Sequence, residues 1–82
     1  MTPLDRIIAE VAMATGVKRS EIMGGSRVRH IVSARHLAMW RARNETDMSL
    51  PAIGRVFRRD HTSILHAIRR MDGIMEGKAN DA

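Results

Sequence analysis

A short apolar segment, three polar residues and a longer segment with helical periodicity limit the fold most strongly. Leu50 to Phe57 is long enough for a two-turn helix, with Ser49 as a candidate N-cap and Pro51 in the first turn. Arg58-Arg59-Asp60 then interrupts it, and Asp60 can cap a helix expected from 61 to 75. One face of that helix is apolar at helical spacing: Ile64, Ala67, Ile68, Met71 and Met75. Two helices joined by so short a break are typical of a helix-turn-helix motif.

The first part of the chain predicts a capped helix and a short helical turn. Thr2-Pro3-Leu4-Asp5 has the residues of a capping box with proline in the first turn. Gly16 is the expected stop. A further helical turn is expected from Ser20 to Met23. The apolar residues of the first helix follow the i, i+3, i+4, i+7 pattern: Leu4, Ile7, Ile8 and Val11.

The middle of the chain predicts a loop followed by a long helix. Gly24-Gly25-Ser26 indicates the loop, and the helix is expected from about His30 to Asn44. Trp40 lies outside the stripe of this helix and is expected to fill a separate contact. The stripe itself consists of small and aliphatic residues that favour close helix packing: Ile31, Ala34, Ala38 and Ala42. The sequence therefore predicts an all-α fold.

The length of 82 residues suits one domain with a small core. We expect this domain to span residues 1–76, with the last helix ending at Gly77 and a flexible tail over 77–82. The absence of cysteine excludes a disulfide framework and a thiolate metal site, and it fits the reducing environment of the cytoplasm. No apolar run approaches the roughly 18 residues of a membrane span, so no membrane partner is expected.

The charges are unevenly distributed, with a formal net charge of +5. No acid occurs between Glu21 and Glu45, and Asp60 is the only acid between Asp47 and Asp72. These two stretches hold most of the arginines: Arg27, Arg29, Arg35, Arg41, Arg43, Arg55, Arg58, Arg59, Arg69 and Arg70. Arginine suits planar, bidentate pairing with phosphates and guanine edges. A polyanionic partner, nucleic acid above all, is the natural inference.

The helix-turn-helix pattern predicts how such a partner would be bound. The second helix of this motif lies in the DNA major groove, and the residues near its N-terminus meet base edges. Here that N-terminus carries His61 and Thr62, preceded by Arg58 and Arg59. A helix N-terminus also attracts phosphate through its free N–H groups and its dipole. The face opposite the apolar one adds polar and basic residues: Thr62, His66, Arg69 and Arg70.

Three blocks between Arg29 and Met71 stand out by their residues, order and spacing. They are Ala34-Arg35-His36-Leu37-Ala38-Met39, Thr46-Asp47-Met48-Ser49-Leu50-Pro51-Ala52-Ile53-Gly54 and Arg59-Asp60-His61-Thr62-Ser63-Ile64-Leu65-His66-Ala67. In order and in spacing these blocks resemble the C-terminal DNA-binding domain of the bacterial replication initiator DnaA, and the region from Ile7 to Ile22 is similar to the opening helices of that domain. The resemblance implies a helix-turn-helix of the Trp repressor and DnaA C-terminal kind, binding double-stranded DNA at DnaA-box-like sites.

The resemblance also implies the roles of individual residues. In the family an Asp-His-Thr triplet reads bases in the major groove, which implies Asp60, His61 and Thr62, with Ser63 beside them. An arginine of the family's basic loop enters the minor groove, and its place here is Arg29. An Asp can accept from a cytosine amino group, a Thr methyl can pack on thymine, and Arg favours narrow minor grooves. The residues implied at phosphates are Arg27, Arg35, Arg43 and Ser49.

The chain departs from the family in two ways. Where the family has Phe-Gly-Gly-Arg/Lys-Asp-His, this chain has Phe57-Arg58-Arg59-Asp60-His61, which is one residue shorter and lacks glycine. We expect Arg58 and Arg59 to add phosphate contacts. The full initiator also carries an ATPase module, and this chain has no G-x-x-x-x-G-K-[ST] loop, so no nucleotide is expected. With Met1 at its start, the chain is expected to be a free-standing DnaA-like protein; an excised domain is the other interpretation.

Alternative functions explain less of the sequence. His61 and His66 do not have the i, i+4 spacing of a paired metal site, and the serines lack a base-and-acid constellation, so no metal, cofactor or enzymatic activity is expected. The leading alternative is a module that binds the initiator or its regulators without reading bases. That alternative leaves the basic face and the Asp60-His61-Thr62 block unexplained. As a DNA-binding protein, the chain is expected to regulate replication initiation or transcription.

Overall fold

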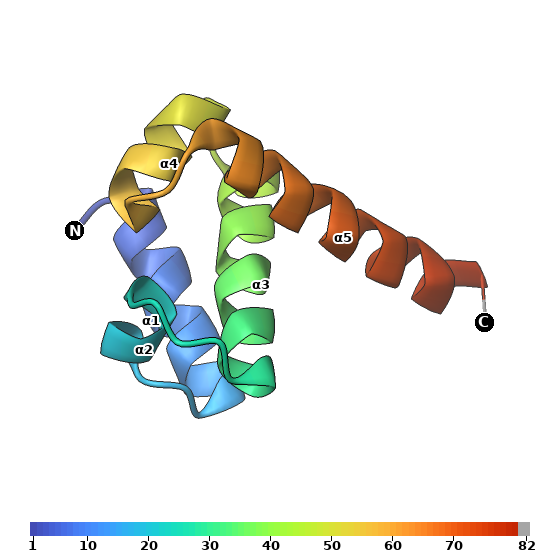
Figure 1. Ribbon diagram of the computed structural model, residues 1–82, viewed down its shortest axis with the longest axis horizontal. Helices are drawn as coiled ribbons and strands as arrows, with labels where there is room; N and C mark the ends of the chain where they lie inside the picture. The colour runs from blue at the N-terminus through green and yellow to red at the C-terminus, as the bar shows by residue number, and fades with distance from the viewer. Residues whose placement is uncertain (81–82) are drawn as a thin grey trace.

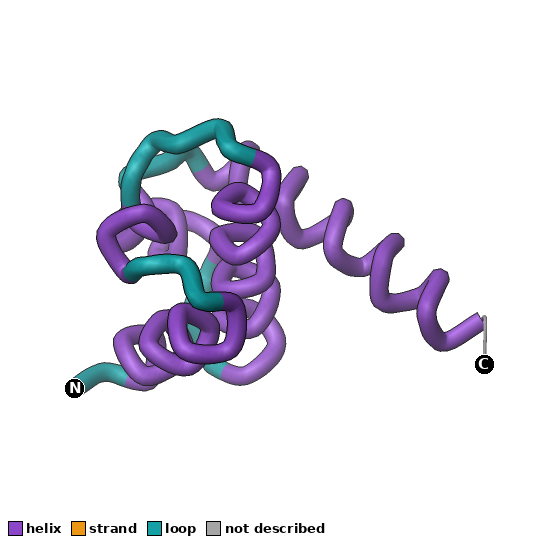
Figure 2. Tube along the Cα trace, turned by 90° about the horizontal axis from the view of Figure 1, so that it is seen from below, coloured by secondary structure: helices purple, strands orange, loops and turns teal. Residues whose placement is uncertain are grey.

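The computed structural model describes residues 1–80, with side chains through Gly77, and over this range the chain forms five α-helices and no strand. Figure 1 shows α5 crossing one end of α3 and extending away from the other helices, and Figure 2 shows the same projection from below. The all-α prediction is confirmed. The helices are α1 (Pro3–Thr15), α2 (Arg19–Met23), α3 (Arg29–Glu45), α4 (Leu50–Phe57) and α5 (His61–Asn80).

Local capping fixes both ends of α1 as the sequence predicted. The Asp5 N–H donates to Thr2 Oγ1 at 3.1 Å, and the Thr2 N–H donates to Asp5 Oδ2 at 3.1 Å. At the other end Gly16 takes a left-handed backbone with φ of 74°, and its N–H donates to the Ala12 carbonyl at 2.9 Å. These bonds satisfy backbone groups that the helix itself leaves unpaired.

Helix α3 is the centre of the domain, because it packs against each of the other helices. Its small residues allow this close approach, and the predicted stripe is buried on it: Ile31, Ala34, Ala38 and Ala42. Trp40 lies beside the stripe, where its Nε1–H donates to Asp72 Oδ1 of α5 at 2.8 Å. The core around α3 is aliphatic with a single Phe, and its largest fully buried side chains are Phe57, Ile7, Ile8, Ile22, Met39, Ile53, Ile64 and Val11.

The turn between α4 and α5 closes without glycine at its left-handed position. Arg58 takes φ of 57° there, a conformation that costs a non-glycine residue about 1–2 kcal/mol. The Arg59 N–H donates to the Gly54 carbonyl at 2.8 Å, which satisfies a carbonyl at the end of α4. A Cβ on Gly54 would stand 2.5 Å from the carbonyl oxygen of Arg59. The shortened turn is therefore made possible by Gly54, whose missing side chain lets the backbone fold back on α4.

Most helix limits lie within one residue of the prediction: α2 begins at Arg19 instead of Ser20, and α3 ends at Glu45 instead of Asn44. Helix α3 begins at Arg29, one residue before the expected start, and α5 continues through Gly77 to Asn80 instead of ending at Gly77. Gly77 does not adopt a left-handed backbone, and a glycine inside a helix costs only about 1 kcal/mol relative to alanine. Residues 81–82 of the expected tail lie outside the described residues, and the limits of domain and tail remain predictions. Within residues 1–80, none of the helices combines the length and hydropathy needed to span a bilayer.

Candidate nucleic-acid interface

The start of α5 presents the predicted reading residues to solvent. Asp60, His61, Thr62 and Ser63 are all exposed, whereas Ile64 immediately after them is fully buried. The apolar face of α5 packs on the core as predicted, and the exposed face continues with His66, Arg69 and Arg70. The amphipathic pattern thus decides the rotation of α5, and that rotation turns the Asp-His-Thr block outward.

Asp60 occupies the position before α5, and its carbonyl accepts the Ile64 N–H at 3.2 Å. Its carboxylate lies 3.2 Å from Nδ1 of His61. Within the part of the chain that the structure describes, this carboxylate receives no hydrogen bond from a first-turn N–H of α5, so the expected side-chain cap is not formed. The carboxylate is two-thirds exposed, which leaves it available as an acceptor for a ligand.

A second basic element precedes α3. The loop over residues 24–28, which we call the basic loop, carries Arg27 and leads directly into Arg29, the first residue of α3. Both arginine side chains are exposed. Ser26 Oγ accepts the Val28 N–H at 3.2 Å, which helps to order the loop just before the helix.

A groove of about 310 Å³ joins this element to α5. Four of the side chains that line this groove are basic. Arg27 and Arg29 come from the basic loop and the start of α3, His36 comes from the middle of α3, and Arg70 comes from α5. Burial lowers the pKa of His36 below its ordinary value, and the positive charges of Arg70, Arg35 and Arg59 lower it further. The tertiary structure therefore gathers three arginines and a half-buried histidine along one groove of the domain.

Sequence reasoning did not include His36 and Arg70 among the site residues. Arg70 was visible as part of the exposed face of α5, and His36 stood inside the block Ala34 to Met39. Only the packing of α3 against α5 places them together with Arg27 and Arg29.

Arg35 is turned inward. Its side chain is only 4% exposed, and its guanidinium donates to three backbone carbonyls: Ile22 O at 2.8 Å, Ser26 O at 2.9 Å and Glu21 O at 2.9 Å. Burial and the nearby Arg59 lower the pKa of Arg35. Since it is buried and three of its five N–H donors hold the end of α2 and the basic loop, Arg35 is left out of the interface proposed below, and its phosphate contact stays an untested prediction.

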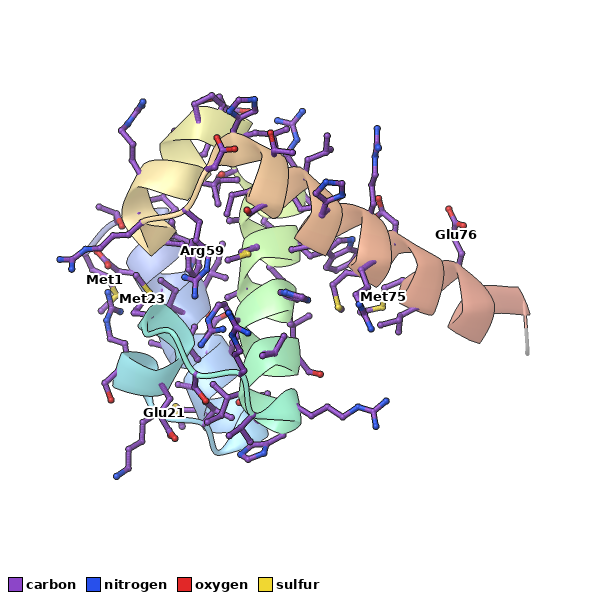
Figure 3. The ribbon with its side chains drawn as sticks, viewed as in Figure 1. Met1, Glu21, Met23, Arg59, Met75 and Glu76 are labelled. Carbon is purple, nitrogen blue, oxygen red and sulfur yellow. The ribbon has the colours of Figure 1, made fainter. Side chains whose placement is uncertain are left out.

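Arg59 is also turned inward. Its Nη1 donates to the Phe57 carbonyl at 2.9 Å, and its Nη2 donates to the Gly24 carbonyl at 2.8 Å. Figure 3 shows the side chain of Arg59 reaching from the α4–α5 turn toward the side of the molecule where Glu21 and Met23 of α2 lie. Arg58, by contrast, is exposed and remains free to face a ligand.

Arg43 and Ser49 lie together at the junction of α3 and α4. Arg43 is exposed, and its Nη1 is 3.4 Å from the Met48 carbonyl. Ser49 Oγ accepts the Ala52 N–H at 3.2 Å, so this serine caps α4 as predicted and keeps its own hydroxyl proton to donate. Among the described residues, no three His, Cys, Asp or Glu side chains come together as a metal-binding group.

An exposed, acid-poor face on a helix-turn-helix whose second helix starts with Asp-His-Thr defines the class of a helix-turn-helix DNA-binding domain. The family model of the bacterial DnaA protein helix-turn-helix matches residues 4–71. The chain belongs to this family of non-catalytic domains, which binds DnaA-box DNA, and the predicted resemblance is confirmed.

Curated relatives agree with this assignment. The chain is 42% identical over 76 residues to the chromosomal replication initiator protein DnaA of Cutibacterium acnes, covering 92% of this chain and 15% of that protein. It is 41% identical over 73 residues to the chromosomal replication initiator protein DnaA of Xanthobacter autotrophicus, covering 88% of this chain and 14% of that protein. The chain thus spans about one seventh of the length of these initiators.

Proposed function

We propose that this protein binds double-stranded DNA at a DnaA-box-like sequence and reads it in two adjacent grooves. The observation that carries the proposal is the protein groove of about 310 Å³ described above, because Arg27 and Arg29 line it together with Arg70 of α5. With the start of α5 in the major groove, the basic loop would follow the neighbouring backbone and bring Arg29 to the adjacent minor groove.

The major-groove contacts would come from the exposed start of α5. Asp60 has an exposed carboxylate that can accept from a cytosine amino group, and His61 beside it can donate or accept. Thr62 can pack its methyl on a thymine methyl, and Ser63 can bond to a base or to a phosphate. Arg29 would supply the minor-groove contact, since guanidinium groups favour the strong negative potential of a narrow minor groove.

Phosphate contacts would fix the domain on the duplex. Their donors would be groups without a carboxylate partner within 4 Å among the described residues, and all of them except the half-buried His36 are exposed. Neutralised phosphates release counterions, so binding should weaken steeply with salt. The proposed set keeps four predicted residues and adds two from the structure: Arg27, Arg43, Ser49 and Arg58, with His36 and Arg70.

Such binding would place the protein in the cytoplasm, on the nucleoid, at sites that an initiator also recognises. The relatives named above are chromosomal replication initiator proteins. A chain with their C-terminal domain could occupy initiator boxes and thereby regulate replication initiation or transcription.

The decisive test is a fluorescence-anisotropy titration against a duplex with a DnaA-type box and against a scrambled duplex, each at two salt concentrations. We expect tight, salt-sensitive binding that prefers the box. Equal, weak binding to both duplexes would contradict base reading by α5.

Substitution of Thr62 tests base reading at one residue. Thr62→Ala should cost about 1–3 kcal/mol of binding free energy on the box and little on the scrambled duplex, because the methyl and hydroxyl contacts depend on sequence. Thr62→Ser is the matched control, since it removes only the methyl group and should lose less. An equal loss on both duplexes would remove Thr62 from the base-reading set.

A second candidate function has one structural observation in its favour. An apolar groove of about 700 Å³ lies between α3 and the projecting half of α5, with Leu37, Met71 and Met75 among its lining residues and Ile74 47% exposed at its side. This surface suits a module that binds the initiator or one of its regulators. Co-sedimentation with full-length initiator, with and without Met75→Ser, distinguishes this function, because Met75 lines the apolar groove and not the groove beside Arg27 and Arg70.

A further inference from the structure

Arg59 connects two parts of the molecule that are far apart in sequence. It belongs to the α4–α5 turn, directly before Asp60, yet its Nη2 donates to the carbonyl of Gly24 in the basic loop at 2.8 Å. Its Nη1 donates to the Phe57 carbonyl at 2.9 Å, which fixes the guanidinium plane from the other side. Among the described residues, the Gly24 bond is the only hydrogen bond between residues 50–80 and the basic loop.

Arg35 holds the neighbouring carbonyls of the same stretch. Its three bonds reach Glu21, Ile22 and Ser26, so two guanidinium groups together hold carbonyls on both sides of Gly25. Arg35 belongs to α3, so its bonds anchor the loop to that helix. Arg59 adds the one hydrogen bond that ties the basic loop to the turn before α5, the helix proposed to enter the major groove.

We infer that Arg59 is a positioning residue that sets the separation between Arg27 in the basic loop and the reading residues at the start of α5. This inference rests on the proposed function. A contact held in place before binding loses less conformational freedom when the complex forms, so Arg27 contributes more to affinity while the loop is tied. An arginine suits the task because its planar fork can hold two carbonyls at once, which a lysine ammonium on a flexible stem does not reproduce.

Arg59→Lys separates this role from a simple phosphate contact, since it keeps the positive charge and loses the fork. We expect Arg27→Ala to weaken box binding about three- to tenfold in the wild-type background and less than about twofold in the Arg59→Lys background. Arg29→Ala and Thr62→Ala are the matched controls. Arg29 is held by α3 and Thr62 by α5, so their losses should be the same in both backgrounds.

A second measurement needs no DNA. Amide hydrogen exchange of residues 24–28 should accelerate about tenfold in Arg59→Lys, because the loop loses its bond to the turn, while exchange in the core of α3 stays unchanged. Arg58→Lys is the control for this measurement, since Arg58 lies in the same turn and is exposed. Should Arg59→Lys fail to fold, a single glycine inserted after Gly25 gives the loop slack with Arg59 intact, and it should remove the Arg27 contribution in the same way.

The outcomes separate the inference from the function on which it rests. A reduced Arg27 contribution together with faster loop exchange supports the positioning role. Losses from Arg27→Ala that are equal in both backgrounds, or unchanged exchange of the loop, overturn it. A wild-type protein that does not prefer the box refutes the proposed function, whereas the exchange measurement still shows whether Arg59 holds the loop.

Discussion

The arginines of the α1–α3 scaffold and those of the exposed face around α5 are partnered in opposite ways. In the scaffold, Arg19 binds the Asp5 carboxylate at 2.8 Å, and Arg41 binds both Glu10 and Glu45 at 2.7 Å. Other exposed arginines have no carboxylate within 4 Å among the described residues: Arg27, Arg29, Arg43, Arg55, Arg58, Arg69 and Arg70, of which Arg27, Arg29 and Arg70 share one groove. Ion pairs therefore neutralise the arginines of the scaffold, and the unpaired arginines carry the positive net charge of the domain.

Arg35 and Arg59 form a third group between these two regions. Their donors bind backbone carbonyls instead of carboxylates, so they neither neutralise a charge nor offer their fork to a ligand. The comparison shows that arginine content alone does not measure a DNA-binding surface. The partner of each guanidinium decides whether it supports the fold, holds a loop or faces the solvent.

Gly54→Ala should have the largest effect on the helix-turn-helix region. The added Cβ would stand 2.5 Å from the Arg59 carbonyl oxygen, a backbone atom that cannot move without opening the turn. We expect a loss of about 2–3 kcal/mol in the free energy of unfolding, measured by urea denaturation with circular dichroism. Gly73→Ala is the control, because nothing lies within 4 Å of its Cβ and the helix should gain up to about 1 kcal/mol. A Gly54→Ala protein as stable as wild type would contradict the close turn.

Arg35→Met tests the third group of arginines directly. It leaves buried carbonyls of the α2 end and the basic loop without donors, so we expect a loss of about 2–4 kcal/mol in unfolding free energy. Arg43→Met should change stability by less than about 0.5 kcal/mol, since Arg43 is exposed, and should weaken binding to any duplex. Full stability of Arg35→Met combined with a lower salt slope of DNA binding would return Arg35 to the phosphate contacts.

His36 should make the proposed DNA binding sensitive to pH. Burial and the positive charges of Arg70, Arg35 and Arg59 hold its pKa below the ordinary value, so the free protein keeps this imidazole neutral at pH 7. A nearby phosphate favours the protonated form, and binding should therefore take up a proton. We expect box affinity to rise about two- to fivefold between pH 7.5 and pH 6, and His36→Gln to reduce this rise. An identical pH profile for wild type and His36→Gln would place His36 outside the interface.

Asp5→Asn should have the smallest effect, and only on the scaffold. Hydrogen bonds from Arg19 and Thr2 lower the pKa of Asp5 to about 2. A carboxylate with a lowered pKa in the folded state adds stability above its ordinary pKa of 3.8, and this stability is lost as the pH falls toward 2. The stability difference between wild type and Asp5→Asn should shrink over that interval in urea titrations, with box affinity at pH 7 unchanged. A change in box affinity would mean that the two regions are coupled.

Most of the fold could be predicted because its signals are local. Thr2, Asp5 and Gly16 limit α1 through bonds that span three or four residues, and Ser49 caps α4 in the same way. The apolar face of α5 follows from periodicity alone, and it turns the Asp60-His61-Thr62 block outward without further information. The end of α5 was misjudged because a glycine is compatible with both a stop and a continued helix, with an energy difference of only about 1 kcal/mol.

The sequence by itself determined the helices, the motif and the exposure of the reading residues, since each depends on neighbours within one or two turns. The tertiary structure alone decided which arginines bind backbone carbonyls and which stay exposed. Arg35 binds carbonyls 9 to 14 residues away, and Arg59 binds one that is 35 residues away. His36 meets Arg70 only because α3 packs on α5. A long, flexible guanidinium takes whichever acceptor the folded chain brings within reach, and that acceptor is not encoded in the residues beside it.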